Sequence, residues 1–145
     1  MASAEEILAV MECAANYAER ASVLDAKGQS ENFTEDCEFW GPPASMGLPD
    51  EPIKGRDGIV AFFQPTFDGL EYLQQHPHMS SVKINGDTAT AHTRFTEFAK
   101  LKGGPLLMVM AHNEDELRKV NGRWLFSKRR MILKKLTAIT ELPMG

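Results

Sequence analysis

Residues 82–95 read VKINGDTATAHTRF, and residues 117–126 read LRKVNGRWLF. In each stretch an Asn-Gly pair, Asn85-Gly86 or Asn121-Gly122, interrupts a segment in which side chains alternate in polarity. Such a pair between alternating segments is the strongest short-range sign of a β-hairpin. The four strands predicted around these turns fall near 78–85, 87–100, 105–120 and 123–136. The second half of the chain is therefore expected to form a long antiparallel meander.

The first half of the chain shows helical periodicity. Ser3 and Glu6 have the spacing of a capping box, and apolar residues recur at three- and four-residue steps from Ile7. The pattern predicts one helix that Gly28 ends. At 100° per residue, Asp25 returns to the angle of Ile7, so the helix is expected to present this carboxylate on its buried stripe.

Two short elements are predicted between this helix and the meander. Residues 37–40 look like a brief strand that the glycine and prolines of 41–43 end. Residues 59–63 look like a short apolar helix that Pro65 terminates. A proline-rich loop is expected between the two.

The composition is that of one folded domain. With 145 residues, 43% of them hydrophobic and 25% charged, the chain is expected to form a single domain over 1–145. Helices followed by an antiparallel sheet predict the α+β class. We expect a cone-shaped, curved sheet with the N-terminal helices on its concave face, enclosing a pocket.

Charge and hydropathy exclude several classes of partner. The net charge is −4, and alternation would divide the basic group at 128–135 between two faces, so nucleic acid is not expected as a partner. The sequence shows neither a secretory signal nor a membrane span, which predicts a cytoplasmic protein with no membrane partner. Cys13 and Cys37 are interpreted as packing residues rather than a disulfide.

A catalytic dyad is the sharpest hypothesis from the residues alone. Val82 and Ile84 must face the core, and His78 shares their parity, so His78 is expected to point inward. An inward Asp25 could fix the tautomer of this ring and raise its basicity, with Tyr17 as a hydrogen-bond donor. The alternative is that Asp25 bonds local amides and His78 is a hydrogen-bonded core residue.

Apolar side chains are expected to line the pocket, although ordinary core packing is the alternative for most of them. The predicted lining residues are Trp40, Phe62, Phe63, Phe67, Tyr72, Phe95 and Met110. On the strand near 87–100, parity places Ala89, Ala91, Thr93 and Phe95 inward and His92 and Arg94 outward. The direction of His112 and the role of Glu97 stay open.

No metal or cofactor is expected. His76 and His78 have a spacing that could place two imidazoles on one metal ion, but no third or fourth ligand is evident. The sequence also contains no Gly-rich phosphate loop after a first strand and no G-x-S-x-G motif.

The order of these features resembles the nuclear transport factor 2-like superfamily over residues 5–136. The segments that carry the resemblance are 24–28, 33–39, 54–59, 85–89 and 120–124. Within the superfamily, the SnoaL-like and scytalone dehydratase-like branch carries a helix-end aspartate where Asp25 stands and a catalytic histidine near His78.

The resemblance implies a cofactor-independent lyase or isomerase, dehydratase-like or cyclase-like, in which His78 and Asp25 abstract a proton from a mostly apolar small molecule. The alternative is a non-catalytic module of the same fold for small-molecule binding or subunit assembly. A homodimer or homotrimer is expected through the outer face of the sheet, with Leu107, Val109 and Met131 as contact residues.

Overall fold

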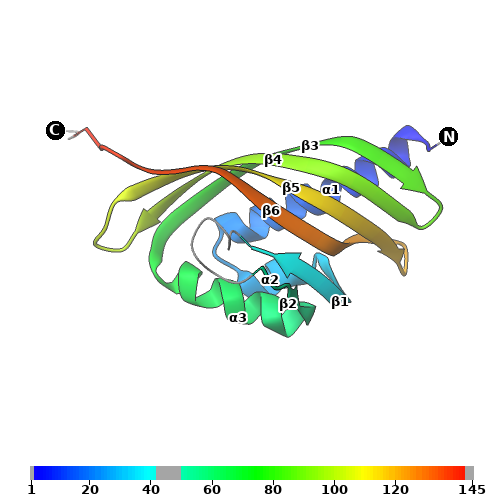
Figure 1. Ribbon diagram of the computed structural model, residues 1–145, viewed down its shortest axis with the longest axis horizontal. Helices are drawn as coiled ribbons and strands as arrows, with labels where there is room; N and C mark the ends of the chain where they lie inside the picture. The colour runs from blue at the N-terminus through cyan, green and yellow to red at the C-terminus, as the bar shows by residue number, and fades with distance from the viewer. Residues whose placement is uncertain (1, 42–49, 143–145) are drawn as a thin grey trace.

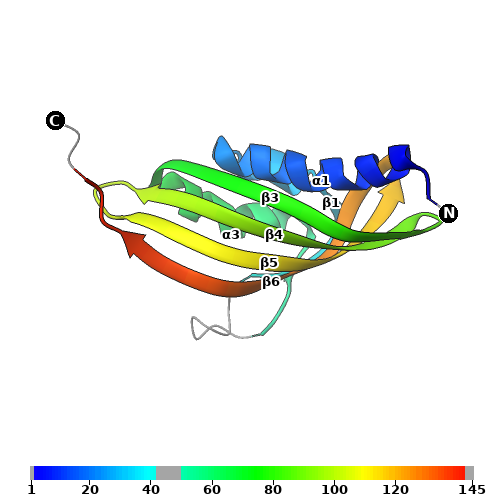
Figure 2. The same cartoon turned by 90° about the horizontal axis from the view of Figure 1, so that it is seen from above.

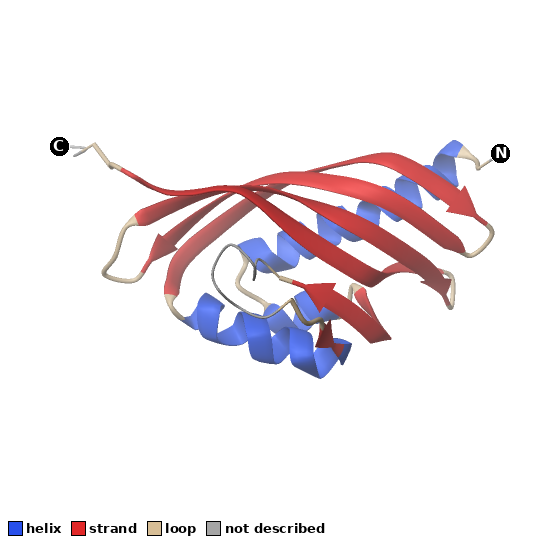
Figure 3. Ribbon diagram, in the orientation of Figure 1, coloured by secondary structure: helices blue, strands red, loops and turns tan. Residues whose placement is uncertain are grey.

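The fold is seen in a computed structural model that describes residues 2–41 and 50–142 (Figures 1 and 3). Helices come first and long strands follow, as predicted. In chain order the elements are α1 (Ala4–Ser22), α2 (Ala26–Ser30), β1 (Phe33–Trp40), β2 (Ile53–Lys54), α3 (Gly55–Asp68), β3 (Leu70–Asn85), β4 (Thr88–Leu101), β5 (Leu106–Val120) and β6 (Arg123–Ile139).

The strands of the described residues form one curved sheet in the order β2-β1-β6-β5-β4-β3. Strands β3 to β6 are the predicted antiparallel meander, and β1 joins it parallel to β6. In Figure 2 α1 lies along this sheet, and Figure 1 shows α2 and α3 on the same side as α1. The α+β class and the helix-covered concave face are therefore confirmed.

Helix α1 begins where the sequence predicts but ends earlier. The Ser3 hydroxyl accepts a hydrogen bond from the Glu6 amide at 3.1 Å, which confirms the cap. The helix ends at Ser22 and not at Gly28, because Leu24 adopts a left-handed conformation with φ of 59°. A separate helix, α2, then starts after Asp25.

The strand predicted at 37–40 and the helix predicted at 59–63 are both longer in the structure. Strand β1 begins at Phe33, and α3 begins at Gly55 and continues through Pro65 to Asp68. Pro65 lies near the end of the helix and removes one backbone hydrogen bond. Burial of Phe67 in the core offsets the cost of that lost hydrogen bond. Strand β1 ends at Trp40, but the predicted loop around 42–49 lies outside the described residues.

The main core lies between α1, α3 and the concave face of the sheet. Several of its largest buried members are aromatic, and the ring centre of Phe33 lies 6.1 Å from that of Phe39 and 5.5 Å from that of Phe126. Cys13 and Cys37 are buried here as free thiols, which confirms their interpretation as packing residues. None of the helices in the described ranges combines the length and hydropathy that crossing a membrane requires.

Candidate functional site

Side-chain alternation along β4 defines the inner wall of the site. Ala89, Ala91, Thr93 and Phe95 are buried and His92 and Arg94 are exposed, as the sequence predicts. The same alternation turns Glu97 toward the concave face, where it is partly buried. Strand β4 therefore contributes both a hydroxyl and a carboxyl group to the interior.

The prediction that His78 points inward is wrong. Between Ser80 and Lys83 the pairing of β3 with β4 shifts register, and Ser81 has a φ of 55°, which marks a β-bulge. One extra residue reverses the parity, so Met79 is buried while His78 is exposed on the outer face.

The prediction that Asp25 lies on a buried helical stripe is also wrong. Its side chain is 39% exposed and lies 3.6 Å from the Arg20 guanidinium. Asp25 is instead the N-cap of α2, and its carboxylate accepts the Gly28 amide at 2.8 Å. A Cβ on Gly28 would lie 2.2 Å from Oδ2 of that carboxylate, so a larger residue at this position would displace the capping side chain. Asp25 and His78 thus form no dyad.

Three of the predicted lining residues belong to the outer face. Tyr72 and Met110 are each 45% exposed, because Leu73 and Ala111 take the inward positions beside them. Trp40 lies opposite Arg130, whose guanidinium carbon is 4.6 Å from the centre of its ring, and it lines a hollow with outward-facing residues of β4 and β5. These three predictions are corrected.

The residues predicted for a subunit interface face the other way. Leu107, Val109 and Met131 lie in register with Ala99, Glu97 and Asn113, respectively, which are all concave-face residues. The run from Leu106 to Ala111 is apolar on both faces, so its sequence does not distinguish the two directions.

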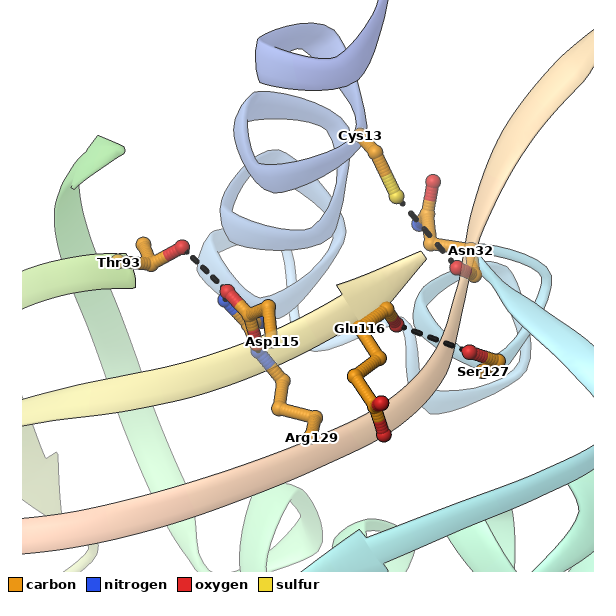
Figure 4. Close-up of polar contacts among 7 residues, drawn as sticks. All are labelled: Cys13, Asn32, Thr93, Asp115, Glu116, Ser127 and Arg129. Atoms are coloured by element: carbon orange, nitrogen blue, oxygen red, sulfur yellow. Dashed lines mark hydrogen bonds and ion pairs between the residues drawn. The ribbon is translucent and has the colours of Figure 1, made fainter. Parts of the chain in front are cut away.

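A buried ionic cluster occupies the concave face of β4, β5 and β6 (Figure 4). Arg129 donates from Nε to Oδ1 of Asp115 at 2.8 Å and from Nη2 to Oδ2 at 3.3 Å. The Thr93 hydroxyl donates to Oδ2 of the same carboxylate at 2.6 Å. Thr93 and Arg129 are each 1% exposed and Asp115 is 3% exposed. We call these three residues the Asp115 cluster.

Aromatic rings hold the cation of this cluster in place. The guanidinium carbon of Arg129 lies 4.4 Å from the ring centre of Tyr17 and 4.0 Å from that of Phe126. Burial is the largest single influence on the pKa of Arg129 and lowers it, but Asp115, Tyr17 and Cys13 together raise it by more, so the pKa lies above its usual value. Arg129 is therefore a fixed positive charge.

Two polar atoms in this region have no hydrogen-bond partner among the described residues. They are Nη1 of Arg129, a donor, and Oδ1 of Asn113, an acceptor. Asn113 of β5 lies opposite Thr93 of β4, and Asp115 follows Asn113 by two residues on β5. Because buried polar groups are nearly always paired, these two atoms are available to a bound molecule or to water.

Glu97 provides a second polar group farther along the concave face. Its carboxylate accepts a hydrogen bond from Gln75 Nε2 at 3.0 Å. Burial raises the pKa of Glu97, and the hydrogen bond from Gln75 offsets part of the rise. Such a carboxyl group can hold or accept a proton closer to neutral pH than an exposed one can.

Tyr17 of α1 connects the two polar groups. Burial raises the pKa of its hydroxyl, Arg129 opposes the rise, and the carboxylates of Glu97 and Asp115 add to it. Tyr17 is thus buried on the concave side, within electrostatic range of both groups, and stays neutral as a donor. Its proposed function as a donor to a ligand remains a prediction.

The remaining predicted lining residues, Phe62, Phe63, Phe67 and Phe95, lie on the inner side of the fold. The Phe63 ring packs against Tyr17 and Phe67, with ring centres 6.5 and 5.7 Å apart, respectively. Phe67 and Phe95 are buried. Their expected role in lining a pocket stays a prediction.

Sequence reasoning missed the Asp115 cluster, although a signal for it existed. Leu117 has the alternation of a core residue, and the same parity places Asp115 and Asn113 inward. Arg129 was part of the basic group near the end of the chain, where its neighbours Lys128 and Arg130 do face outward. Within residues 2–41 and 50–142, no group of three His, Cys, Asp or Glu side chains could hold a metal ion.

Comparison with known proteins identifies the family. A family model described as a SnoaL-like domain matches residues 2–130. No curated protein sequence matches the chain.

Solved structures share the fold at low sequence identity. A candidate aromatic ring hydroxylase from Novosphingobium aromaticivorans is 22% identical, with 96% of each chain covered and a TM-score of 0.83. A candidate scytalone dehydratase from the same organism is 19% identical over 97% of this chain and 93% of that one, with a TM-score of 0.78. A hexachlorocyclohexane dehydrochlorinase is 12% identical over 97% and 93%, with a TM-score of 0.80. The resemblance drawn from the sequence is confirmed for the fold.

Proposed function

The chain belongs to the family of SnoaL-like domains, and on that basis we propose that it is a cofactor-independent lyase or isomerase for a mostly apolar carbonyl compound. The proposed base is Glu97, in place of the His78 and Asp25 dyad that the sequence suggested. Tyr17 and Arg129 are the proposed hydrogen-bond donors.

The observation that carries the proposal is the environment of Glu97. This carboxyl group lies on the concave face, is held by Gln75 and has a raised pKa because it is partly removed from water. A base works best when its pKa lies near the working pH, and a positioned base typically contributes ~10²–10⁴ in rate.

The chemistry follows from the charges around this carboxyl group. Glu97 removes a proton from the carbon next to a carbonyl, and the electron pair moves to the carbonyl oxygen. The Tyr17 hydroxyl or the unpaired Nη1 of Arg129 donates a hydrogen bond to that oxygen as its negative charge develops. Protonated Glu97 then returns the proton to another carbon, which is an isomerisation, or a leaving group departs, which is an elimination.

The names of two structurally similar proteins support this class of reaction. The candidate scytalone dehydratase and the hexachlorocyclohexane dehydrochlorinase are named for eliminations. An elimination that begins with proton removal from carbon needs a positioned base and no redox group.

The proposal can be tested before the natural substrate is known. The chain is incubated in heavy water with small, mostly apolar cyclic ketones such as 2-tetralone, and loss of the proton next to the carbonyl is followed by NMR. We expect exchange faster than in buffer, a loss of roughly 10²-fold or more in Glu97→Gln, and a normal rate in the matched outer-face variant Glu114→Gln. His78→Ala should also exchange at the normal rate.

Two results would contradict the proposal. Exchange at the buffer rate with every ketone argues against proton abstraction, and equal exchange by wild type and Glu97→Gln argues against this base. Saturation transfer from the protein to a ketone without any exchange would favour the alternative, a non-catalytic small-molecule-binding module. The unpaired atoms of Arg129 and Asn113 are the observation in favour of that alternative.

A further inference from the structure

All four histidines of the chain lie on the outer face of the sheet, opposite the proposed active site. Three of them, together with an arginine and a lysine, line one hollow of about 360 Å³. We call this the outer hollow; its basic residues are His76, His78, Arg94, His112 and Lys134. It extends over β3, β4, β5 and β6.

The outer hollow concentrates one sign of charge. Its other lining residues are apolar or neutral, namely Phe95, Thr96, Met110 and Ala111. The chain as a whole has a net charge of −4, so the absence of acidic residues among those that line the hollow is a local feature. Among the described residues, neither Arg94 nor Lys134 is within ion-pair distance of a carboxylate.

A neighbouring hollow on the same face contains both acidic and basic residues, so the absence of acidic residues is specific to the outer hollow. The neighbouring hollow is lined by Glu114 and Glu116 together with Lys128 and Arg130. Lys128 there lies 3.8 Å from Glu116, so cations in that hollow have carboxylate partners within the chain.

Strand register brings the basic groups of the outer hollow into direct opposition. His78 is the cross-strand partner of Arg94, and Arg94 is the cross-strand partner of His112. When the imidazoles carry a proton, like charges lie directly opposite each other, which destabilises a sheet. An anion in this hollow would convert that repulsion into attraction.

We propose that the outer hollow is a binding site for a doubly charged oxyanion, a phosphate group or a sulfate, held by Arg94, Lys134 and the three histidines. Met110, which is exposed at the hollow, offers an apolar contact to an organic group attached to that anion. This site is separate from the concave face, and it does not depend on the proposed function.

Protonation of His112 links binding to pH. The pKa of His112 lies below its usual value of 6.5, first because of burial and then because of Lys134 and Arg94; His92 also lowers it, and Glu114 opposes the decrease. A bound anion favours the charged ring and raises this pKa. Binding should therefore be stronger at pH 6 than at pH 8.

The test follows the histidine ring signals of the full chain by NMR while sulfate replaces chloride at constant ionic strength. Sulfate keeps its two charges between pH 6 and pH 8, so a pH effect reports on the protein. We expect saturable shifts of His76, His78 and His112, with little shift of His92 outside the hollow, and affinity about tenfold or more weaker at pH 8. Arg94→Gln should weaken binding by about tenfold, whereas Lys83→Gln, on the same face but outside the hollow, should not.

Inorganic phosphate and phenyl phosphate distinguish the two sources of such a group. Tighter binding of phenyl phosphate supports a phosphate attached to an apolar molecule, and equal binding supports the free anion. Equal shifts of all four histidines, or equal affinities of Arg94→Gln and Lys83→Gln, would overturn the proposal by showing only non-specific screening. A dimer detected by sedimentation whose formation shifts these histidine signals, with no sulfate-dependent shift, would overturn it as well.

Discussion

Replacing Asp115 by asparagine tests whether the Asp115 cluster is the buried ion pair that its geometry indicates. The side chains of Arg129 and Asp115 are 1% and 0% exposed, with Nε and Oδ1 2.8 Å apart. Asparagine keeps the size of the side chain but leaves the guanidinium without a counter-charge. Arginine does not lose its proton in proteins, so the uncompensated charge stays in the core.

The expected loss is large for one substitution. Breaking a buried pair by removing one partner costs about 3–5 kcal/mol of unfolding free energy, and it lowers the Tm by roughly 10–16 °C for a domain of this size. The matched control is Asp36→Asn, which removes the partner of Arg118 from a pair whose side chains are 43% and 70% exposed. An exposed pair is worth about 0–1 kcal/mol.

Urea denaturation of the two variants provides the measurement. A third variant, Asp115→Asn with Arg129→Met, removes the stranded charge and should be more stable than Asp115→Asn alone, because an apolar residue replaces an unpaired cation. If Asp115→Asn lowers the free energy of unfolding no more than Asp36→Asn does, the pair is not buried as described. The proposed site would then lack a buried, fixed positive charge.

Two further predictions concern Glu97 and the bulge of β3. Folding raises the pKa of Glu97, so the contribution of this group to stability is fully present below its unfolded pKa, near 4.5, and is lost as pH rises through the folded value. Glu97→Gln can still accept the hydrogen bond from Gln75, so in urea unfolding it should be more stable than wild type at pH 8 but not at pH 4.5. A stability difference that does not change with pH would contradict this prediction. Ser81 has a φ of 55°, a conformation that favours glycine. We therefore expect Ser81→Gly to stabilise the fold by about 0.5–1 kcal/mol and the neighbouring Ser80→Gly to destabilise it by a similar amount. Equal effects of the two substitutions would refute the bulge.

The local parts of the fold follow from the sequence alone. The serine cap of α1, the hairpin at Asn121-Gly122 and the inward series from Ala89 to Phe95 each depend on residues close together in the chain. Periodicity and turn chemistry act over such short distances, so these features, and the family resemblance built on them, were predictable.

The site depends on the tertiary structure. Periodicity alone assigned inward directions to the side chains of His78 and Asp25, and the tertiary structure places both elsewhere. Serine and leucine rarely adopt a positive φ, so neither the bulge at Ser81 nor the end of α1 at Leu24 has a sequence signal. Pairing with β4 absorbs the extra residue of β3 and turns His78 outward. The pairing of Asp115 with Arg129, from two different strands, likewise forms only when β5 and β6 are in register. Sequence patterns record which side chains alternate, whereas contacts between distant segments determine where that alternation is interrupted and which polar groups meet.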